Sequence, residues 1–262
     1  MKLKRFLSSV LALVLIVSLP VSAFAAEWYL EDGDITVSAD GSGQTVSQGG
    51  TAVTDDAPVI KQRDSSMATD STITISTSDG ATADITIEDV NISSKGDSID
   101  VGSSSAKITL EGDNKLFSES GSGLHVSDGD VTVTGSGSLE AGSKNDSNNN
   151  AAIGSHENED MSGDITIGGN AKVTAVSRDD GAGIGSGDMG EMSGDITIGD
   201  NAQVTVWSET AGLIESWLVG ELDKTPEEIV GFLDQVIHNH TRGAKLRFEG
   251  QDNGSGKPRA MK

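Results

Sequence analysis

The chain has no cysteine, few aromatic residues and few basic ones, and each shortage excludes a class of protein. Without cysteine, the fold cannot depend on disulfide bonds. Phe, Trp and Tyr make up 3% of the 262 residues, which is too few for a compact enzyme core built on large side chains. The 18 Lys and Arg face 41 Asp and Glu, for a formal net charge of −23. A chain this acidic is a poor partner for nucleic acid or an anionic bilayer, because phosphate binding needs a basic face.

The first 25 residues have the pattern of a secretory signal peptide. Lys2, Lys4 and Arg5 precede an apolar run over 7–19, and Ala-Phe-Ala at 23–25 is a small-x-small cleavage site. Because the apolar run is short for a membrane span, we expect cleavage rather than anchoring. The predicted mature chain begins near residue 26 and is secreted or attached to the cell surface, with no membrane insertion after cleavage.

Residues 150–208 contain nearly the same sequence twice. Ile153 and Ile165 of the first copy recur 31 places later as Ile184 and Ile196. A fixed period with short alternating strands is typical of a solenoid, in which each repeat buries its apolar face only against its neighbours.

Related strand motifs, in which apolar residues alternate with polar ones, occur before these copies as well. Ile85 and Ile108 are 23 residues apart, as are Ile108 and Val131, whereas the later coils span 34 and 31 residues. The shorter spacing is near the minimum for a coil of three short strands, and the longer coils contain surface loops. The sequence therefore predicts an all-β fold, a right-handed parallel β-helix. The motifs are DITI at 84–87, KITL at 107–110, DVTV at 130–133, DITI at 164–167 and DITI at 195–198.

The repeat pattern ends near residue 216, and a helix signal follows. Thr225, Pro226 and Glu228 form a capping box, and apolar residues at helical spacing continue to Ile237. We expect a helix over about 226–239 that covers the last coil. The predicted organisation is a leader over 1–25, an N-terminal cap and first rung over 26–71, coils over 72–216, a helical cap over 217–250 and a disordered tail over 251–262.

Carboxylates precede most of the strand motifs and are predicted to form one outward column, interrupted by Lys107. Asp130, Asp164 and Asp195 are the candidate metal ligands, since stacked carboxylates repel one another unless a hard cation such as calcium bridges them. The alternative is that each Asp accepts backbone N–H bonds at the turn before its strand. Both interpretations remain open from the sequence.

Three outward residues are candidates for carbohydrate binding. Trp207 faces outward if Val204 and Val206 face inward, and an exposed indole suits stacking on a sugar ring. The alternative is that Trp207 packs beneath the C-terminal helix. Thr166 and Thr197 offer hydroxyl groups on the outer side of their strands.

Residues 84–208 resemble the secreted carbohydrate-binding β-helix domains of Gram-positive anaerobic bacteria. The resemblance rests on DITIEDVNI (84–92), KITLEGDNKL (107–116), AAIGS (151–155) and GAGIGSG (181–187). The segment over 28–50 is similar to the lead-in of such domains. The resemblance implies binding of acidic or plant-type polysaccharides, with calcium as a structural or bridging ion. The helix-bearing C-terminus departs from the family pattern, which usually continues with more GAGIG repeats.

Three functions follow as hypotheses. The first is a non-catalytic, secreted or cell-surface protein that binds an acidic polysaccharide with calcium. The second is a structural surface or adhesin spacer without glycan binding. The third is a pectin-type polysaccharide lyase, which needs a basic proton abstractor beside a calcium cluster. The basic residues of the coils are isolated, with no basic pair on one strand face, so we expect no enzymatic activity. The sequence predicts no particular oligomeric state.

Overall fold

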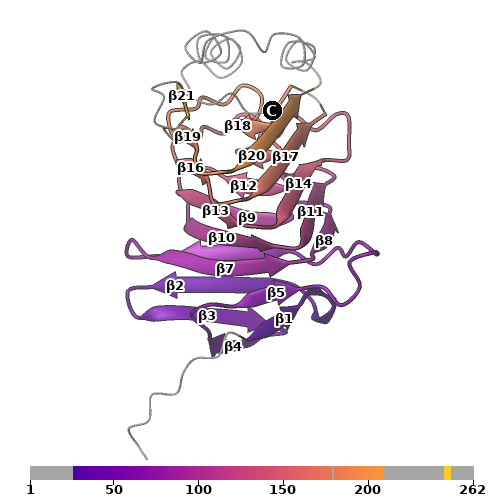
Figure 1. The fold of residues 1–262 in the computed structure, drawn as a ribbon, viewed down its shortest axis with the longest axis vertical. Helices are drawn as coiled ribbons and strands as arrows, with labels where there is room; N and C mark the ends of the chain where they lie inside the picture. The colour runs from indigo at the N-terminus through magenta and orange to yellow at the C-terminus, as the bar shows by residue number, and fades with distance from the viewer. Residues whose placement is uncertain (1–25, 179, 209–244, 249–262) are drawn as a thin grey trace, which may run out of the picture.

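The computed structural model describes residues 26–178, 180–208 and 245–248, which form a parallel β-helix with three sheets (Figure 1). The predicted β-helix is confirmed. Sheet A contains β1 (Glu27–Tyr29), β5 (Val59–Lys61), β7 (Thr82–Glu88), β10 (Ser105–Glu111), β13 (Val131–Gly135), β16 (Ile165–Ile167), β19 (Asp195–Ile198) and β21 (Lys245–Phe248). Sheet C contains β8 (Asn91–Ser94), β11 (Asp113–Ser118), β14 (Ser138–Ser143), β17 (Lys172–Ser177) and β20 (Gln203–Ser208).

Sheet B combines the third strand of each coil with an N-terminal extension. Its order is β18 (Ile184–Gly185), β15 (Ile153–Gly154), β12 (Leu124–Val126), β9 (Ile99–Gly102), β6 (Ile73–Thr77), β2 (Ile35–Asp40), β3 (Gly43–Gln48) and β4 (Thr51–Thr54). One short 3-10 helix, η1 (Leu30–Asp32), follows β1.

Each coil forms because its strands alternate apolar and polar residues. Ile85 pairs with Ile108, which pairs with Val133, and all three are buried. Thr86 and Thr109 lie between these positions and point outward. Burial of each such aliphatic side chain contributes about 1.5–3 kcal/mol, so the inward columns specify which face of every strand is inside.

The register between β10 and β13 differs from the expected one. Ile108 pairs with Val133, and Val131 pairs with Ala106. The sequence spacing aligned Ile108 with Val131, which is wrong by two residues. A two-residue shift keeps every apolar side chain on the inner face, so alternation alone does not distinguish the two registers.

The register also divides the predicted carboxylate column. Lys107 pairs with Asp84 on one side and with Thr132 on the other, so both residues belong to a column that continues with threonines. Asp130 lies instead beside Ser105, whose Oγ accepts its backbone N–H at 3.4 Å. The fold therefore does not place Asp84, Lys107 and Asp130 in a single column.

The N-terminal segment closes one end of the solenoid with antiparallel strands. β2 pairs parallel with β6 but antiparallel with β3, and β3 pairs antiparallel with β4. Trp28 packs against the core, and its Nε1 donates to Asp55 Oδ2 at 2.9 Å. β2, β3 and β4 lie within residues 26–71, the predicted cap and first rung, whereas β6 begins at Ile73.

The predicted C-terminal helix over 226–239 lies outside the described residues, as do the predicted leader over 1–25 and the tail over 251–262. Within the predicted helical cap, β21 adds a strand to sheet A, parallel to β19. Among the residues that the structure describes, none belongs to a helix long and apolar enough to cross a membrane.

Candidate functional site

Asp130, Asp164 and Asp195 follow one another on successive coils at the start of the sheet A strands. Oδ1 of Asp130 accepts the backbone N–H of Asp164 at 3.0 Å, and Oδ1 of Asp164 accepts that of Asp195 at 2.7 Å. The carboxylates therefore act as backbone acceptors, although the N–H belongs to the next coil rather than to the same turn. All three side chains are exposed, and coils about 4.8 Å apart leave the second oxygens accessible to solvent. Their role as calcium ligands stays a prediction.

Thr166 and Thr197 lie on the outer face of the same sheet. Thr132 pairs with Thr166, which pairs with Thr197, and all three are partly exposed. The same column begins with Asp84 and Lys107, whose side chains form an ion pair at 2.8 Å. The outer face of sheet A thus carries hydroxyl groups and carboxylates, and the cation of Lys107 is already paired.

Trp207 lies on a different sheet from the two threonines. In β20 it pairs with Val176 of β17, in a column that continues through Gly142 to Phe117. Trp207, Val176 and Phe117 are each partly exposed, whereas Val173 and Ala175 on the same strand as Val176 are buried. The outward position predicted for Trp207 agrees with this register. The three predicted carbohydrate-binding residues, however, do not form one surface.

A polar column runs beside these apolar residues on the outer face of sheet C. It consists of Asn91, Lys115, Glu140, Thr174 and Thr205. A shallow groove of about 380 Å³ crosses its first coils. The groove is lined by Ser65, Ser66, Asn91, Asp113, Asn114, Lys115, Ser138 and Glu140. Hydroxyl, amide, amine and carboxylate groups are thus placed beside an apolar column.

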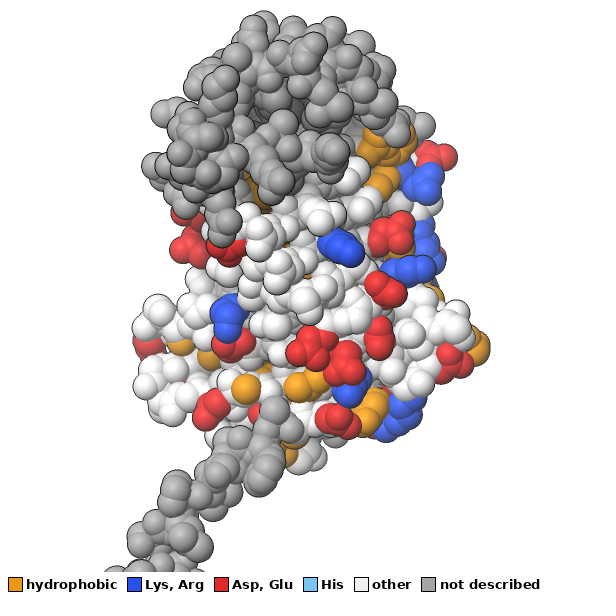
Figure 2. All heavy atoms as spheres, viewed as in Figure 1, with side chains coloured by type: hydrophobic (Ala, Val, Ile, Leu, Met, Phe, Trp, Pro, Cys, Tyr) orange, Lys and Arg blue, Asp and Glu red, His pale blue; other side chains and the backbone are white. Residues whose placement is uncertain are grey.

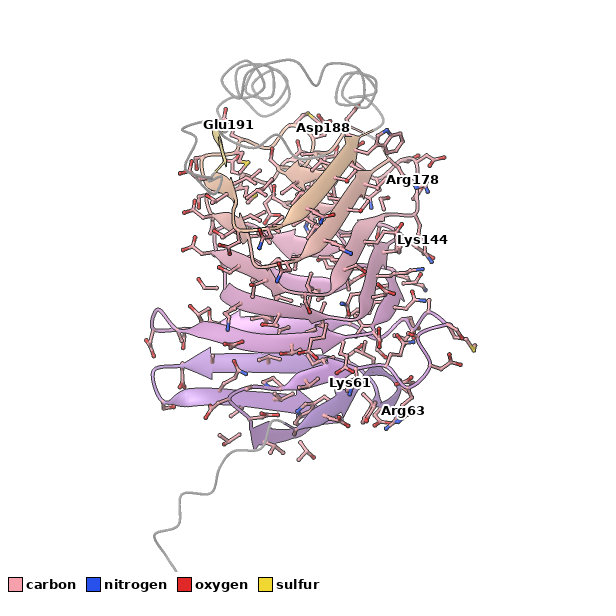
Figure 3. The ribbon with its side chains drawn as sticks, in the orientation of Figure 1. Lys61, Arg63, Lys144, Arg178, Asp188 and Glu191 are labelled. Carbon is pink, nitrogen blue, oxygen red and sulfur yellow. The ribbon has the colours of Figure 1, made fainter. Side chains whose placement is uncertain are left out.

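Four basic residues of the later coils lie on or directly after strands of sheet C, whereas Lys245 and Arg247 belong to β21 of sheet A. Lys115 and Lys172 lie on β11 and β17, and Lys144 and Arg178 directly follow β14 and β17. In Figure 2 blue side chains occur on the right-hand flank, where Figure 1 places these strands. Figure 3 shows Lys144 and Arg178 projecting on that same side.

Two of these cations, Lys115 and Lys172, differ in their partners from those of the first coils, whereas Arg178 lies 3.7 Å from Asp146. Lys61 is paired with Glu27 and Glu88, both at 3.1 Å, and Arg63 with Asp32 at 2.7 Å. Within the part of the chain that the structure describes, Lys115 and Lys172 form no ion pair. Sheet C therefore offers cations to an external anion.

Sheet B brings together a cluster that the sequence interpretation missed. His125 of β12 lies between Asp100 of β9 and Glu159, with Nδ1 2.8 Å from Asp100 Oδ1 and Nε2 2.9 Å from Glu159 Oε2. His156 stacks on His125, with ring centroids 3.9 Å apart and planes 5° from parallel. His156 Nε2 lies 2.8 Å from Asp97 Oδ1.

The carboxylates change the protonation of this cluster. Burial alone would lower the pKa of His125, but its contacts with Asp100 and Glu159 and the charge of Asp97 raise that pKa to about 9. Burial likewise opposes ionisation of Asp97, yet hydrogen bonds from His156 and from the backbone N–H of Ser122 hold its pKa below the ordinary value. His125 is thus favoured as a cation beside ionised carboxylates.

The fold makes room for this cluster with a glycine. His125 pairs with Gly154, whose φ of +137° suits glycine, and a Cβ there would meet the carbonyl of Gly185. The chain then continues into the loop over 155–162, which carries His156 and Glu159 onto the outer face of sheet B. From the sequence, the segment HENED at 156–160 was a weak candidate for calcium ligands, with a solvated acidic surface as the favoured interpretation. One outward histidine on a strand, with a histidine in the loop of the next coil, is the signal that it overlooked.

Comparisons with family models, with curated proteins and with solved structures each found no significant match. The function must therefore be argued from the geometry of the three outer faces.

Proposed function

We propose that this protein is an exported, non-catalytic carbohydrate-binding protein that binds an acidic polysaccharide along the outer face of sheet C. The observation that supports the proposal is the pair of adjacent columns on that face. One contains Phe117, Val176 and Trp207, and the other contains Lys115. Lys172 lies in the next column beyond that of Lys115, and neither lysine forms an ion pair among the described residues. Aromatic and apolar groups stack on sugar rings, and lysines attract uronate carboxylates.

The repetition of the coils favours a polymer over a small ligand. Lys115, Glu140 and Thr174 occupy successive positions of one column, so a polar group recurs at about the 4.8 Å spacing of the strands. Several weak contacts along one chain of sugar residues add to a useful overall affinity when they engage together. The shallow groove at Asn91 and Lys115 provides one end of such a path.

We expect calcium to bind at sheet A, apart from the proposed polysaccharide path on sheet C. The formal charge of −23 opposes the approach of an acidic polymer to the protein as a whole. Calcium held by the free oxygens of Asp130, Asp164 and Asp195 would reduce this repulsion, since the ion takes several carboxylate oxygens at once. The polysaccharide then contacts sheet C directly, and calcium bound at sheet A increases its affinity.

Affinity electrophoresis of the purified protein tests the proposal, on gels containing acidic or neutral polysaccharides, with calcium and then with a chelator. We expect retardation on a uronate polymer, which Lys172→Gln reduces. Lys107→Gln is the matched control, because Lys107 is a lysine at an equivalent strand position on sheet A and is already paired with Asp84. Retardation lost with both variants alike would point to overall charge rather than to sheet C.

The two other hypotheses give different results in the same experiment. A structural spacer shows no retardation on any polysaccharide. A polysaccharide lyase releases unsaturated ends that absorb in the near ultraviolet, and incubation with the same polymers measures them. Either result would replace the proposal.

A further inference from the structure

The cluster on sheet B joins residues from three consecutive coils. Asp97 and Asp100 lie before and within β9, His125 lies on β12, and His156 and Glu159 lie in the loop after β15. Three potential ligand atoms lie within 4.8 Å of one another: one nitrogen of His125, one nitrogen of His156 and a carboxylate oxygen of Asp97. The cluster is on a different sheet from the proposed polysaccharide path.

Glu159 orients both imidazoles. Its Oε2 lies 2.9 Å from His125 Nε2 and 3.6 Å from His156 Nδ1. The remaining nitrogens therefore face Asp97: His156 Nε2 is 2.8 Å from Oδ1, and His125 Nδ1 is 3.8 Å from Oδ2. A carboxylate that holds the far nitrogen of a histidine, while the near nitrogen faces other ligands, is the usual second shell of a metal-bound imidazole.

We propose that Asp97, His125 and His156 bind a divalent transition-metal ion such as zinc, with Asp100 as the fourth ligand. Two imidazoles and two carboxylates form a donor set that zinc accepts in tetrahedral sites. Calcium is not expected here, because it takes oxygen ligands. Asp100 already reaches His125 Nδ1 at 2.8 Å, so its carboxylate is adjacent to the ion position.

The stacked rings must move for the ion to bind. A metal lies near the plane of each coordinating imidazole, and two parallel rings cannot both direct a lone pair at one ion. The His156 side chain is 34% exposed and is carried by a loop, whereas the His125 side chain is 10% exposed and is held on both sides. His156 is therefore the ring that turns out of the stack.

Charge also favours the ion. Asp97, Asp100 and Glu159 place three carboxylates around two imidazoles. A metal ion binds the deprotonated nitrogen of an imidazole, so it displaces any proton from the ring nitrogens that coordinate it. Once bound, it would tie the loop over 155–162 to β9 and β12, and so fasten three coils together.

Isothermal titration calorimetry with zinc chloride, on protein first treated with a chelator and desalted, tests this site. We expect one zinc ion per chain. His156→Gln and Asp97→Asn should each weaken binding by about 100-fold, and Glu159→Gln by about tenfold, since outer carboxylates contribute less than ligands. Excess calcium should not compete. The double variant His238→Gln/His240→Gln is the control, because it removes the other two histidines of the chain.

Cobalt provides a second measurement, by absorption spectroscopy, which does not rely on the heat of binding measured in calorimetry. Bound in place of zinc, it should give the visible absorption of a tetrahedral site with the unaltered protein and lose it with His156→Gln. Circular dichroism establishes that each variant keeps its β structure. Absence of zinc binding, full binding by the folded His156→Gln variant, or loss of binding in the His238/His240 control would each overturn the proposal. None of these results depends on whether the protein binds a polysaccharide.

Discussion

The outer faces of sheets A and C are built from the same coils yet differ in chemistry. On sheet A, threonines continue a column that begins with the Asp84–Lys107 ion pair, and carboxylates hold the backbone of the next coil. On sheet C, Trp207 and Phe117 share an apolar column next to the column of Lys115, which forms no ion pair among the described residues. The inner faces are more alike, because both bury aliphatic side chains, although sheet C also buries serines such as Ser118 and Ser177. The outer faces are free to diverge, since solvent accepts any polar residue there.

The largest expected effect comes from reversing charge on sheet C. Lys115→Glu with Lys172→Glu should weaken retention on a uronate polymer by about 100-fold, because each lysine would contribute about 1.5 kcal/mol to a carboxylate. Affinity electrophoresis measures the change. Lys107→Glu on sheet A, which faces Asp84, should change retention little. Equal losses from both faces would remove the distinction between them.

Removal of one negative charge from sheet A should weaken the binding of calcium rather than that of the polysaccharide. Asp164→Asn keeps an oxygen that accepts the Asp195 N–H but loses the negative charge, so calcium affinity should fall by about tenfold. Calorimetry with calcium measures this, and Lys172→Gln is the comparison that should leave calcium affinity unchanged. If neither the unaltered protein nor the variant binds calcium, the carboxylates serve only the backbone.

The aromatic column on sheet C is expected to contribute less than its lysines. Trp207→Ala should weaken polysaccharide retention by about three- to tenfold, since one stacked ring contributes about 0.5–1.5 kcal/mol. Trp207→Phe should keep most of the affinity, because it preserves a stacking surface. An unchanged affinity in Trp207→Ala would favour a packing role for the indole.

The smallest expected effect concerns stability on sheet A. Asp164→Ala removes the acceptor of the Asp195 N–H, and should lower the free energy of unfolding by about 0.5–1.5 kcal/mol. Asp164→Asn should lower it less, because the acceptor remains. Denaturant unfolding of the two variants compares them, and equal losses would show that charge rather than the hydrogen bond stabilises this position.

Much of the fold was predictable from the sequence because the same alternation of apolar and polar residues recurs in each coil. Ile85, Ile165 and Ile196 alternate with polar neighbours, and only a parallel solenoid stacks such strands at a fixed period. The site was less predictable. Asp164 and Asp195 were correctly assigned to neighbouring coils, but their hydrogen bonds to the next coil depend on register. Trp207 was assigned an outward position without its sheet, so its separation from Thr166 and Thr197 was not apparent.

The sequence by itself determined the class of fold and the side of each strand that is buried, since both follow from local alternation and a repeat period. The tertiary structure decided the register of β13 on β10 and the meeting of His125 with His156. The physical reason is common to both. A shift of two residues leaves every apolar side chain buried, so the choice falls to turn lengths and to contacts between coils. Those contacts join residues that are about one coil apart in the sequence, so a local sequence pattern does not reveal them.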